Sequence, residues 1–364
     1  MNKVLGNIIY RLSATVLLTV MLAACEPSFD FNSEFYHDGV SAGRGEYAGG
    51  RDANEESRNV LILYSAGFNS ISSYLKEDIE DLCKGWVPRQ RRADDVILVY
   101  SHLPSSRGQY TVKTSPVLFR LYSDPSGEVI RDTLEVYSPD TISSSAAQFH
   151  DILSYVKETF QAKSYGLIFS SHATGYLPEG FYSKPDNYTF SEGTMRRRGL
   201  HGRGAPSPVP YVEPEQEPGL PAVKSIGQDV DGNVSYEMDI RDFAEAIPMK
   251  LDYILFDACL MGGIEVAYEL RDVCDRIGFS QTEVLAEGLN YKTLTEHLLK
   301  NTVPNPQAVC EDYFSQYIKQ SGVYQSATIS LIDCRELEPL AEVCKSIFTN
   351  HSAGIKAIRM SNVQ

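Results

Sequence analysis

Continuous apolar runs alternate with amphipathic stretches from residue 59 onward, and this alternation predicts the fold class. Val60–Tyr64 and Val96–Tyr100 are unbroken apolar runs, as is typical of strands buried on both faces. Between them, apolar residues recur at spacings of four, four and three, which places them on one helix face. These residues are Ile71, Leu75, Ile79 and Leu82. The unit strand–helix–strand is the building block of a parallel sheet.

The same pattern predicts the elements that follow. Val117–Tyr122 and Val129–Val136 flank a Pro- and Gly-containing turn and indicate a hairpin. Ser143–Gln161 has helical spacing, with hydroxyls at its start that can cap a helix. Two further apolar runs, Tyr165–Phe169 and Tyr253–Phe256, indicate buried strands. We therefore expect an α/β domain whose mostly parallel sheet is flanked by helices on both faces.

The first 24 residues are typical of a secretory signal. Basic residues precede the mostly apolar run Leu12–Leu22, which is shorter than the roughly 20 residues that a membrane span needs. The ending Leu22-Ala23-Ala24-Cys25 resembles a bacterial lipobox, in which the cysteine becomes the lipidated first residue. We expect export and a lipid anchor on Cys25 that holds the protein to the cell envelope, at the outer membrane or cell surface. The alternative is a plain signal peptide with a coincidental cysteine.

Two segments lack regular patterning. Residues 25–58 are rich in Gly, Ser, Asn and charge, which is typical of a flexible tether. Within the domain at 59–364, the stretch 178–224 contains six prolines after position 205 and cannot form regular helix or sheet. A loop of this length is usually functional or disordered. Beyond it, Asp239 is a candidate cap for a short helix that runs to about Ile247.

Charge and cysteine content exclude some functions. The 33 Lys and Arg against 48 Asp and Glu give a formal charge of −15, which disfavours nucleic acid as a partner. The cysteines form no CxxC pair, so the sequence signals neither a zinc site nor a disulfide scaffold.

His172 and Cys259 each follow a predicted strand, where parallel sheets gather catalytic groups. A thiol attacks a carbonyl well when a nearby imidazole takes its proton and later protonates the leaving amine. We also expect a helix to begin at Cys259, with a dipole that lowers the thiol pKa. A buried structural cysteine and a solvated loop histidine are the alternative interpretations, and the spacing of the two residues does not decide between them.

Two motifs carry a family resemblance. Ser171–Tyr176 resembles the His-Gly-x-Gly-aromatic motif of clostripain-like cysteine peptidases, and Phe256–Gly262 is similar to their Asp-Ala-Cys-Leu-Met motif. Weaker similarity extends from about residue 59 to at least 345. The resemblance implies a caspase-like α/β fold, a Cys/His dyad and a peptide or protein substrate cleaved after Arg or Lys.

The resemblance also implies roles for single residues. Cys259 would be the nucleophile and His172 the general acid/base, with the oxyanion held by the backbone N–H groups of Cys259 and Ala173. Ala173 replaces the family's usual glycine, so the oxyanion hole would be distorted if a glycine conformation is required there. Asp257 matches the aspartate of the S1 pocket, which would pair with a basic side chain. Glu287 lies near where relatives can carry a second acid, although it can equally be a solvated loop residue.

Processing and calcium are further implications of the resemblance. Relatives mature by a cut after a basic residue between the His and Cys segments, so we expect self-cleavage at Arg196, Arg197, Arg198 or Arg203. The alternative is a variable surface loop. No cofactor is required, and calcium is possible because calcium dependence occurs in the family. The turn Asp229–Gly232 resembles part of a calcium loop but lacks the full ligand set.

The second function that the sequence allows is a catalytically silent relative, which would use the same cleft to bind a peptide or a partner protein. The replacement at Ala173 keeps this alternative open.

Overall fold

The computed structural model describes residues 57–91, 93–107, 110–178, 224–232 and 234–357. The predicted signal at 1–24, Cys25, the tether up to residue 56 and the four candidate processing arginines lie outside the described residues.

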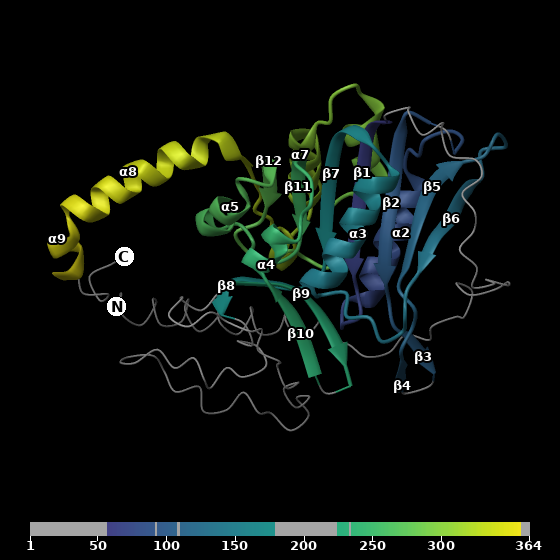
Figure 1. Ribbon diagram of the computed structural model, residues 1–364, viewed down its shortest axis with the longest axis horizontal. Coiled ribbons are helices and arrows are strands. Elements are labelled where there is room, and N and C mark those ends of the chain that lie inside the picture. Colours follow the sequence, from purple (N-terminus) through teal and green to yellow (C-terminus); the bar gives the residue numbers. More distant parts are fainter. Residues whose placement is uncertain (1–56, 92, 108–109, 179–223, 233, 358–364) are drawn as a thin grey trace.

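An eight-stranded sheet forms the centre of the protein (Figure 1). Its order is β13-β12-β11-β7-β1-β2-β5-β6, and the five strands from β12 to β2 run parallel, with antiparallel strands at the borders. The strands are β1 (Ser57–Ala66), β2 (Asp95–His102), β5 (Val117–Ser123), β6 (Val129–Val136), β7 (Ala162–Ser170), β11 (Leu251–Asp257), β12 (Cys274–Phe279) and β13 (Ser330–Asp333). The mixed, mostly parallel sheet confirms the predicted fold class.

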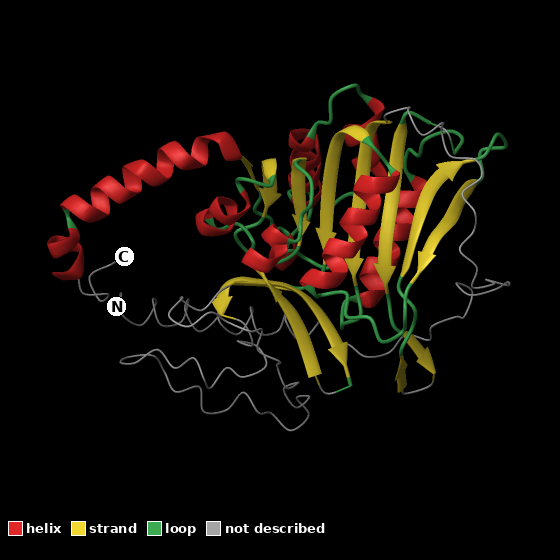
Figure 2. Cartoon of the chain, viewed as in Figure 1, coloured by secondary structure: helices red, strands yellow, loops and turns green. Residues whose placement is uncertain are grey.

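Helices cover both faces of this sheet (Figure 2). One face packs against α3 (Ala146–Thr159), α4 (Ile240–Glu245) and α5 (Ile264–Leu270). The other packs against α2 (Ser72–Lys84), α6 (Tyr291–Thr295), the π-helical turn η3 (Glu296–Lys300) and α7 (Pro306–Tyr317). Successive residues of β1 serve the two cores in turn, because side chains alternate across a strand. Val60 and Ile62 belong to the first core, and Leu61 and Leu63 belong to the second.

An aromatic cluster fixes β7 against the first helical layer. Phe169 of β7 lies edge-on to Phe243 of α4, with ring centroids 5.3 Å apart, and stacks near Tyr64 of β1 at 5.5 Å. Phe243 stacks in turn on Phe149 of α3 at 4.6 Å. Because these rings are fully buried and interlocked, the end of β7 has a fixed position.

The helix caps are the most accurate of the local predictions. Ser145 caps α3 by accepting a hydrogen bond from the Gln148 N–H, and Asp239 caps α4 by accepting one from Arg241 N–H. The boundaries differ by a few residues: α4 ends at Glu245 rather than Ile247, and β1 begins at Ser57, inside the predicted tether.

Two smaller sheets lie beside the main one. The first contains β8 (Ala173–Pro178), β9 (Lys224–Asp231) and β10 (Val234–Asp239), and the second pairs β3 (Ser105–Arg107) with β4 (Tyr110–Val112). Pro178 and Lys224 are partners in the β8–β9 pairing. The pairing therefore holds the two ends of the long predicted loop side by side.

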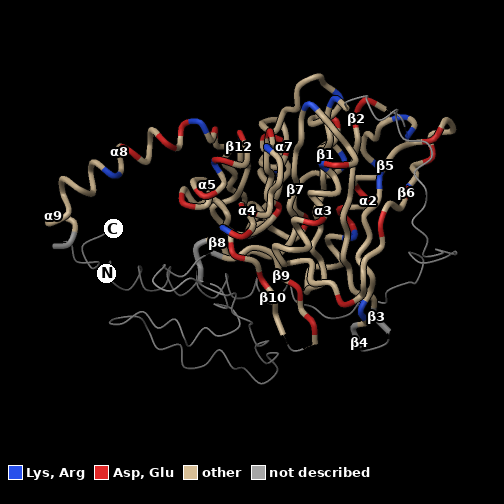
Figure 3. The backbone as a smooth tube through the Cα atoms, in the orientation of Figure 1, with Lys and Arg blue, Asp and Glu red and all other residues tan. Residues whose placement is uncertain are grey.

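The C-terminal helix α8 (Leu337–Asn350) projects from the body and is followed by α9 (Ser352–Ala357) (Figure 1). It follows the 3₁₀ turn η5 (Cys334–Glu336); a further 3₁₀ turn, η4 (Gly322–Tyr324), precedes β13. Its first turn is held to α5, since Glu338 accepts hydrogen bonds from Tyr268 and Arg271. No helix in the described ranges combines the length and apolarity of a membrane span. Figure 3 shows acidic and basic residues interspersed along the described elements.

Candidate active site

The pairing of β7 with β11 places the two candidate catalytic residues at the same rim of the sheet. In this parallel pair Ser170 is the partner of Asp257, and the offset between partners is constant along the strands. His172 lies two residues after Ser170, and Cys259 lies two residues after Asp257. The two residues therefore occupy equivalent positions on neighbouring chain segments. The carboxyl ends of parallel strands are where such sheets collect reactive groups.

His172 is half-buried, and its Nε2 lies 3.0 Å from the Oγ of Ser70. Ser70 is exposed and stands in the loop between β1 and α2. Burial lowers the pKa of His172 to about 4, because the charged imidazolium would lose its hydration. The ring is therefore neutral near pH 7 and can accept a proton. Sequence reasoning missed Ser70, whose usable signal was its place in the loop after the carboxyl end of a predicted strand.

Cys259 faces the backbone of Val284. Its Sγ accepts a hydrogen bond from the Val284 N–H at 3.3 Å and lies 3.6 Å from the Val284 carbonyl oxygen, to which the thiol can donate. Burial raises the pKa of Cys259 to about 11, although the Val284 N–H opposes this shift. Both residues are among those described, and no hydrogen bond joins Cys259 to His172. The resting pair is thus a neutral thiol beside a neutral imidazole.

The expectation that a helix begins at Cys259 is wrong. The following helix α5 starts only at Ile264, after a tight loop in which Leu260 adopts a φ of 63°. This loop is tied to the neighbouring segment, since Leu260 N–H donates to Thr282 O and Gly262 N–H donates to Ser280 O. A helix dipole acts mainly within its first turn, so it does not lower the thiol pKa here.

The left-handed Leu260 makes a close backbone contact that requires a glycine. A Cβ on Gly175 would lie 1.7 Å from the Leu260 carbonyl oxygen, and Gly175 itself has a φ of 53°. A left-handed leucine costs roughly 1–2 kcal/mol, so the surrounding contacts must hold it in place. The second glycine of the histidine motif is therefore the one that the geometry needs, and this sequence keeps it.

The replacement at Ala173 causes no backbone strain. Among the described non-glycine residues, positive φ occurs only at Gln90 and Leu260, so Ala173 adopts an ordinary conformation. Gly227 N–H donates a hydrogen bond to the His172 carbonyl, so His172 and Gly227 form a hydrogen-bonded pair. Bonded and non-bonded pairs alternate along an antiparallel ladder, so the next pair, Ala173 and Ile226, is non-hydrogen-bonded. The Ala173 N–H is thus not used in pairing with β9.

Buried carboxyls lie beneath the same rim. Asp257 is 7% exposed and accepts a hydrogen bond from the Tyr291 hydroxyl at 2.8 Å. Burial raises its pKa to about 6, despite this hydrogen bond. Asp78, on the buried face of α2, has its pKa raised to about 10 by burial and by repulsion from Asp257. Sequence reasoning did not single out Asp78, although an aspartate on an apolar helix face was a usable signal.

Glu287 is exposed on the loop that wraps over Asp257. The next residue, Gly288, has a φ of 55°, and a Cβ there would lie 2.4 Å from Oδ2 of Asp257. The loop backbone therefore lies against the Asp257 carboxylate. Glu287 adds to the negative potential here, since it contributes to the raised pKa of Asp78.

The turn that resembles part of a calcium loop does not fit a calcium ion. The buried Asp229 accepts hydrogen bonds from the backbone N–H groups of Ser143 and Ser144. Asp231 is paired with the Lys113 ammonium, with Nζ and Oδ2 2.8 Å apart. Their oxygens are thus occupied by protein donors, and within the described residues no group of three or more His, Cys, Asp or Glu could hold a metal.

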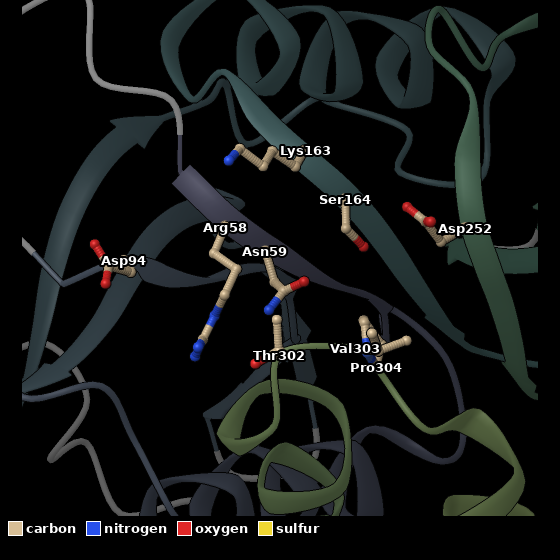
Figure 4. A pocket seen from close by; sticks show the side chains of 9 residues that line it. All are labelled: Arg58, Asn59, Asp94, Lys163, Ser164, Asp252, Thr302, Val303 and Pro304. Carbon is tan, nitrogen blue, oxygen red and sulfur yellow. The ribbon is translucent and has the colours of Figure 1, made fainter.

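A cleft of about 480 Å³ lies at the opposite end of the strands (Figure 4). Its lining includes Arg58 and Asn59 at the start of β1, Ser164 near the start of β7, and Asp252 near the start of β11. None of the predicted site residues lines it, so it is separate from the His172–Cys259 rim.

Comparisons with known proteins give one matching family model and several similar structures. Residues 212–364 match the model of the clostripain family. An inactive zymogen C11 protease from Parabacteroides distasonis has a similar structure, with a TM-score of 0.61 and 24% identity over 85% of this chain and 72% of that one. A secreted C11 cysteine protease from Bacteroides thetaiotaomicron, also 24% identical, gives a TM-score of 0.61 over 81% of this chain and 71% of that one. Its complex with an irreversible peptide inhibitor gives 0.58, over 80% and 71%. At this identity the solved structures show a common fold.

The chain thus shares the caspase-like α/β fold of these proteases. The match to the clostripain family covers residues 212–364, which is less than half of the chain. No curated protein sequence matches the chain.

The raised thiol pKa predicts how Cys259 reacts with an alkylating agent. Only the thiolate is nucleophilic, so the rate of Cys259 modification by iodoacetamide should keep rising above pH 9. The measurement is modification of the Cys259 peptide by mass spectrometry at fixed times across pH 6–11. The alkylation rate of free cysteine at each pH serves as the reference for the reagent. A rate that levels off below pH 8 would contradict the neutral resting thiol.

Proposed function

We propose that this protein is a cysteine endopeptidase that cleaves after Arg or Lys through a dyad of Cys259 and His172. The observation that carries the proposal is the β7–β11 register, which puts the thiol and the imidazole at equivalent positions of adjacent strand ends. A thiol and a neutral imidazole at one rim are the two groups that acyl transfer to sulfur requires.

The first step is proton transfer from the thiol. The Cys259 side chain rotates away from Val284, and the free ring nitrogen of His172 takes its proton. The sulfur then attacks the scissile carbonyl carbon. The backbone N–H groups of Cys259 and Ala173 hold the oxyanion, and the ordinary conformation of Ala173 supports this role.

The second step breaks the peptide bond. The tetrahedral intermediate collapses, and His172 donates its proton to the departing amine, which leaves an acyl-thioester on Cys259. Water then enters, His172 removes its proton, and hydrolysis releases the acid and restores the thiol. No step in this sequence requires a metal or a cofactor.

The preference for a basic side chain follows from the buried carboxyls. A desolvated guanidinium or ammonium needs an anionic partner. Asp257 lies buried two residues before the nucleophile, and Glu287 stands on the loop that covers it. We therefore assign both residues to the S1 pocket, while the raised pKa of Asp78 keeps that carboxyl neutral near pH 7.

Turnover of fluorogenic peptide amides tests the proposal. Wild type should hydrolyse Arg- and Lys-amides and leave a matched neutral amide such as a Gln-amide nearly untouched. Cys259→Ala should lose at least about 10³-fold in kcat/KM, because the nucleophile is gone. The assay is run with and without added calcium. Equal turnover by wild type and Cys259→Ala, or none by either, would contradict the proposal.

The second candidate is the catalytically silent binder, and one observation favours it. The Cys259 thiol is engaged by Val284 on both its donor and acceptor sides, rather than by His172. Absence of Cys259-dependent turnover, together with retained binding of an Arg peptide to Cys259→Ala, would support this function instead.

Ser70 is a positioning residue under the proposal. A hydrogen bond from the His172 Nε2–H to Ser70 Oγ, across 3.0 Å, would fix the tautomer that leaves the other nitrogen free to act as base. Because Ser70 is exposed, its replacement disturbs little packing.

The test compares Ser70→Ala with Ser70→Thr. Ser70→Ala should lower kcat about tenfold with KM nearly unchanged, while Ser70→Thr keeps the hydroxyl and restores most of the rate. Steady-state kinetics on the Arg-amide from pH 5 to 9 measure both. Equal loss in the two variants, or a change confined to KM, would show that Ser70 does not orient the imidazole.

Self-processing is part of the proposal. We place the cut after Arg196, Arg197, Arg198 or Arg203, and the partnership of Pro178 with Lys224 supports it, because the β8–β9 pairing would hold the two fragments together. The cut protein should therefore stay in one piece until it is denatured.

Mass measurements test this prediction. Wild type should elute as one species under native conditions and separate into two fragments in denaturant, while Cys259→Ala stays a single chain. Replacing all four arginines by Gln in the active enzyme should also keep the chain whole. Equal fragmentation of wild type and Cys259→Ala would exclude self-cleavage.

We further propose that the protein is exported and attached to the cell envelope through a lipid on Cys25, at the outer membrane or cell surface. Two solved structures of similar fold agree with export, since each is described as that of a secreted C11 cysteine protease from Bacteroides thetaiotaomicron. The lipobox-like ending before Cys25 supports the anchor.

A further inference from the structure

Two buried cysteines lie in contact at one end of the sheet. Cys274 is fully buried, Cys334 is 5% exposed, and their Sγ atoms are 3.7 Å apart. Both are free thiols. Sulfur atoms at this distance are in van der Waals contact, and a modest side-chain rotation would bring them to the roughly 2.05 Å of a covalent bond.

The contact is produced by the β12–β13 pairing. Arg276 and Asp333 are the last partners in this antiparallel ladder. Cys274 lies two residues before Arg276, and Cys334 directly follows Asp333, so both sit just past the same end of the ladder. The two residues are 60 apart in the sequence, which is why their spacing gave no sign of a pair.

We propose that Cys274 and Cys334 form a disulfide when the protein meets an oxidising medium. Neither residue belongs to the His172–Cys259 rim, so the proposal stands apart from the catalytic one. The Cys274 Sγ also lies 3.4 Å from the Leu270 carbonyl oxygen, at the end of the ladder.

Thiol–disulfide exchange with a small disulfide, such as oxidised glutathione, supplies the chemistry. The Cys334 thiolate attacks one glutathione sulfur, a mixed disulfide forms, and one glutathione leaves as its thiolate. The Cys274 thiolate then attacks the Cys334 sulfur, closes the protein disulfide and releases the second glutathione. The protein loses two protons and two electrons, and the glutathione disulfide gains them to give two glutathione thiols.

The order of attack follows from the two environments. A hydrogen bond from Cys274 lowers the pKa of Cys334, and Cys334 is also the less buried of the two sulfurs. Cys334 is therefore the sulfur that ionises first and that reagent reaches first. Access requires a brief opening of η5 and α8, whose later turns expose Leu340, Val343, Ile347 and Phe348 and so have little packing to break.

The disulfide would join β12 to the segment that carries α8. In the reduced protein, α8 is held to the body mainly through its first turn and α5. A covalent link one helix turn earlier would limit the opening of this segment, so its cleavage by an added protease should slow on oxidation.

Peptide mapping of the full chain tests the proposal. The folded protein is incubated with oxidised glutathione, unfolded in iodoacetamide and digested. The Cys274 and Cys334 peptides should appear joined, with the mass of two hydrogens missing, and their alkylation should fall about tenfold. Cys310, a buried thiol of similar exposure, and the half-buried Cys83 serve as controls in the same sample and should stay alkylated.

Three results would overturn the proposal. These are full alkylation of Cys274 and Cys334 after oxidation, a glutathione adduct on Cys334 that never closes, and equal loss of alkylation at Cys310. In Cys274→Ala, closure is impossible, so the glutathione adduct on Cys334 should accumulate. In that variant, a linked peptide joining Cys334 to another cysteine would show that the reactivity is not specific to the 274–334 pair.

Discussion

The backbone pairing of β7 with β11 is the constraint on which the site depends. Hydrogen bonds between two central parallel strands fix one register, and a slip by a single residue would turn each buried side chain to the wrong face. The aromatic packing of Phe169 against α3 and α4 opposes any such slip. As a result, two short loops that are far apart in the sequence begin at the same level. The positions of His172 and Cys259 are therefore a property of the whole sheet rather than of the loops themselves.

The loop after β11 shows how the rest of the rim is assembled around that register. Leu260 is held in a left-handed conformation, and the room for its carbonyl exists because Gly175 has no side chain. On the other side, Gly288 lets a third loop lie directly on Asp257. Two backbone contacts with glycines thus bring together the loops that carry Cys259, His172 and Glu287. The chemistry of the rim depends on these contacts as much as on the reactive side chains.

The sequence predicted six of the eight strands of the main sheet, the helices α2, α3 and α4, and the neighbourhood of His172 and Cys259, because hydrophobic periodicity and helix caps are local signals. Strands β12 and β13 and the helices from α6 onward were not predicted. The prediction of a helix at Cys259 was wrong for a physical reason. The apolar spacing beyond Ile264 is helical, but the backbone just before it is hydrogen-bonded to Ser280 and Thr282, which no local pattern reveals. The role of Ser70 and the contact of Cys274 with Cys334 were missed because both arise from tertiary packing. The replacement at Ala173 predicts a distorted oxyanion hole if glycine is required there, yet the conformation that demands glycine occurs two residues later, at Gly175.

The strand β6 has a consequence for how the folded protein behaves among its own copies. It borders the main sheet, with its outer backbone groups available to another strand. Its side chains include Arg131 and Asp132, which form ion pairs with Glu80 and Arg91. Docking a second sheet edge here would require these charges to lose water, so the border resists the edge-to-edge growth that leads to aggregates.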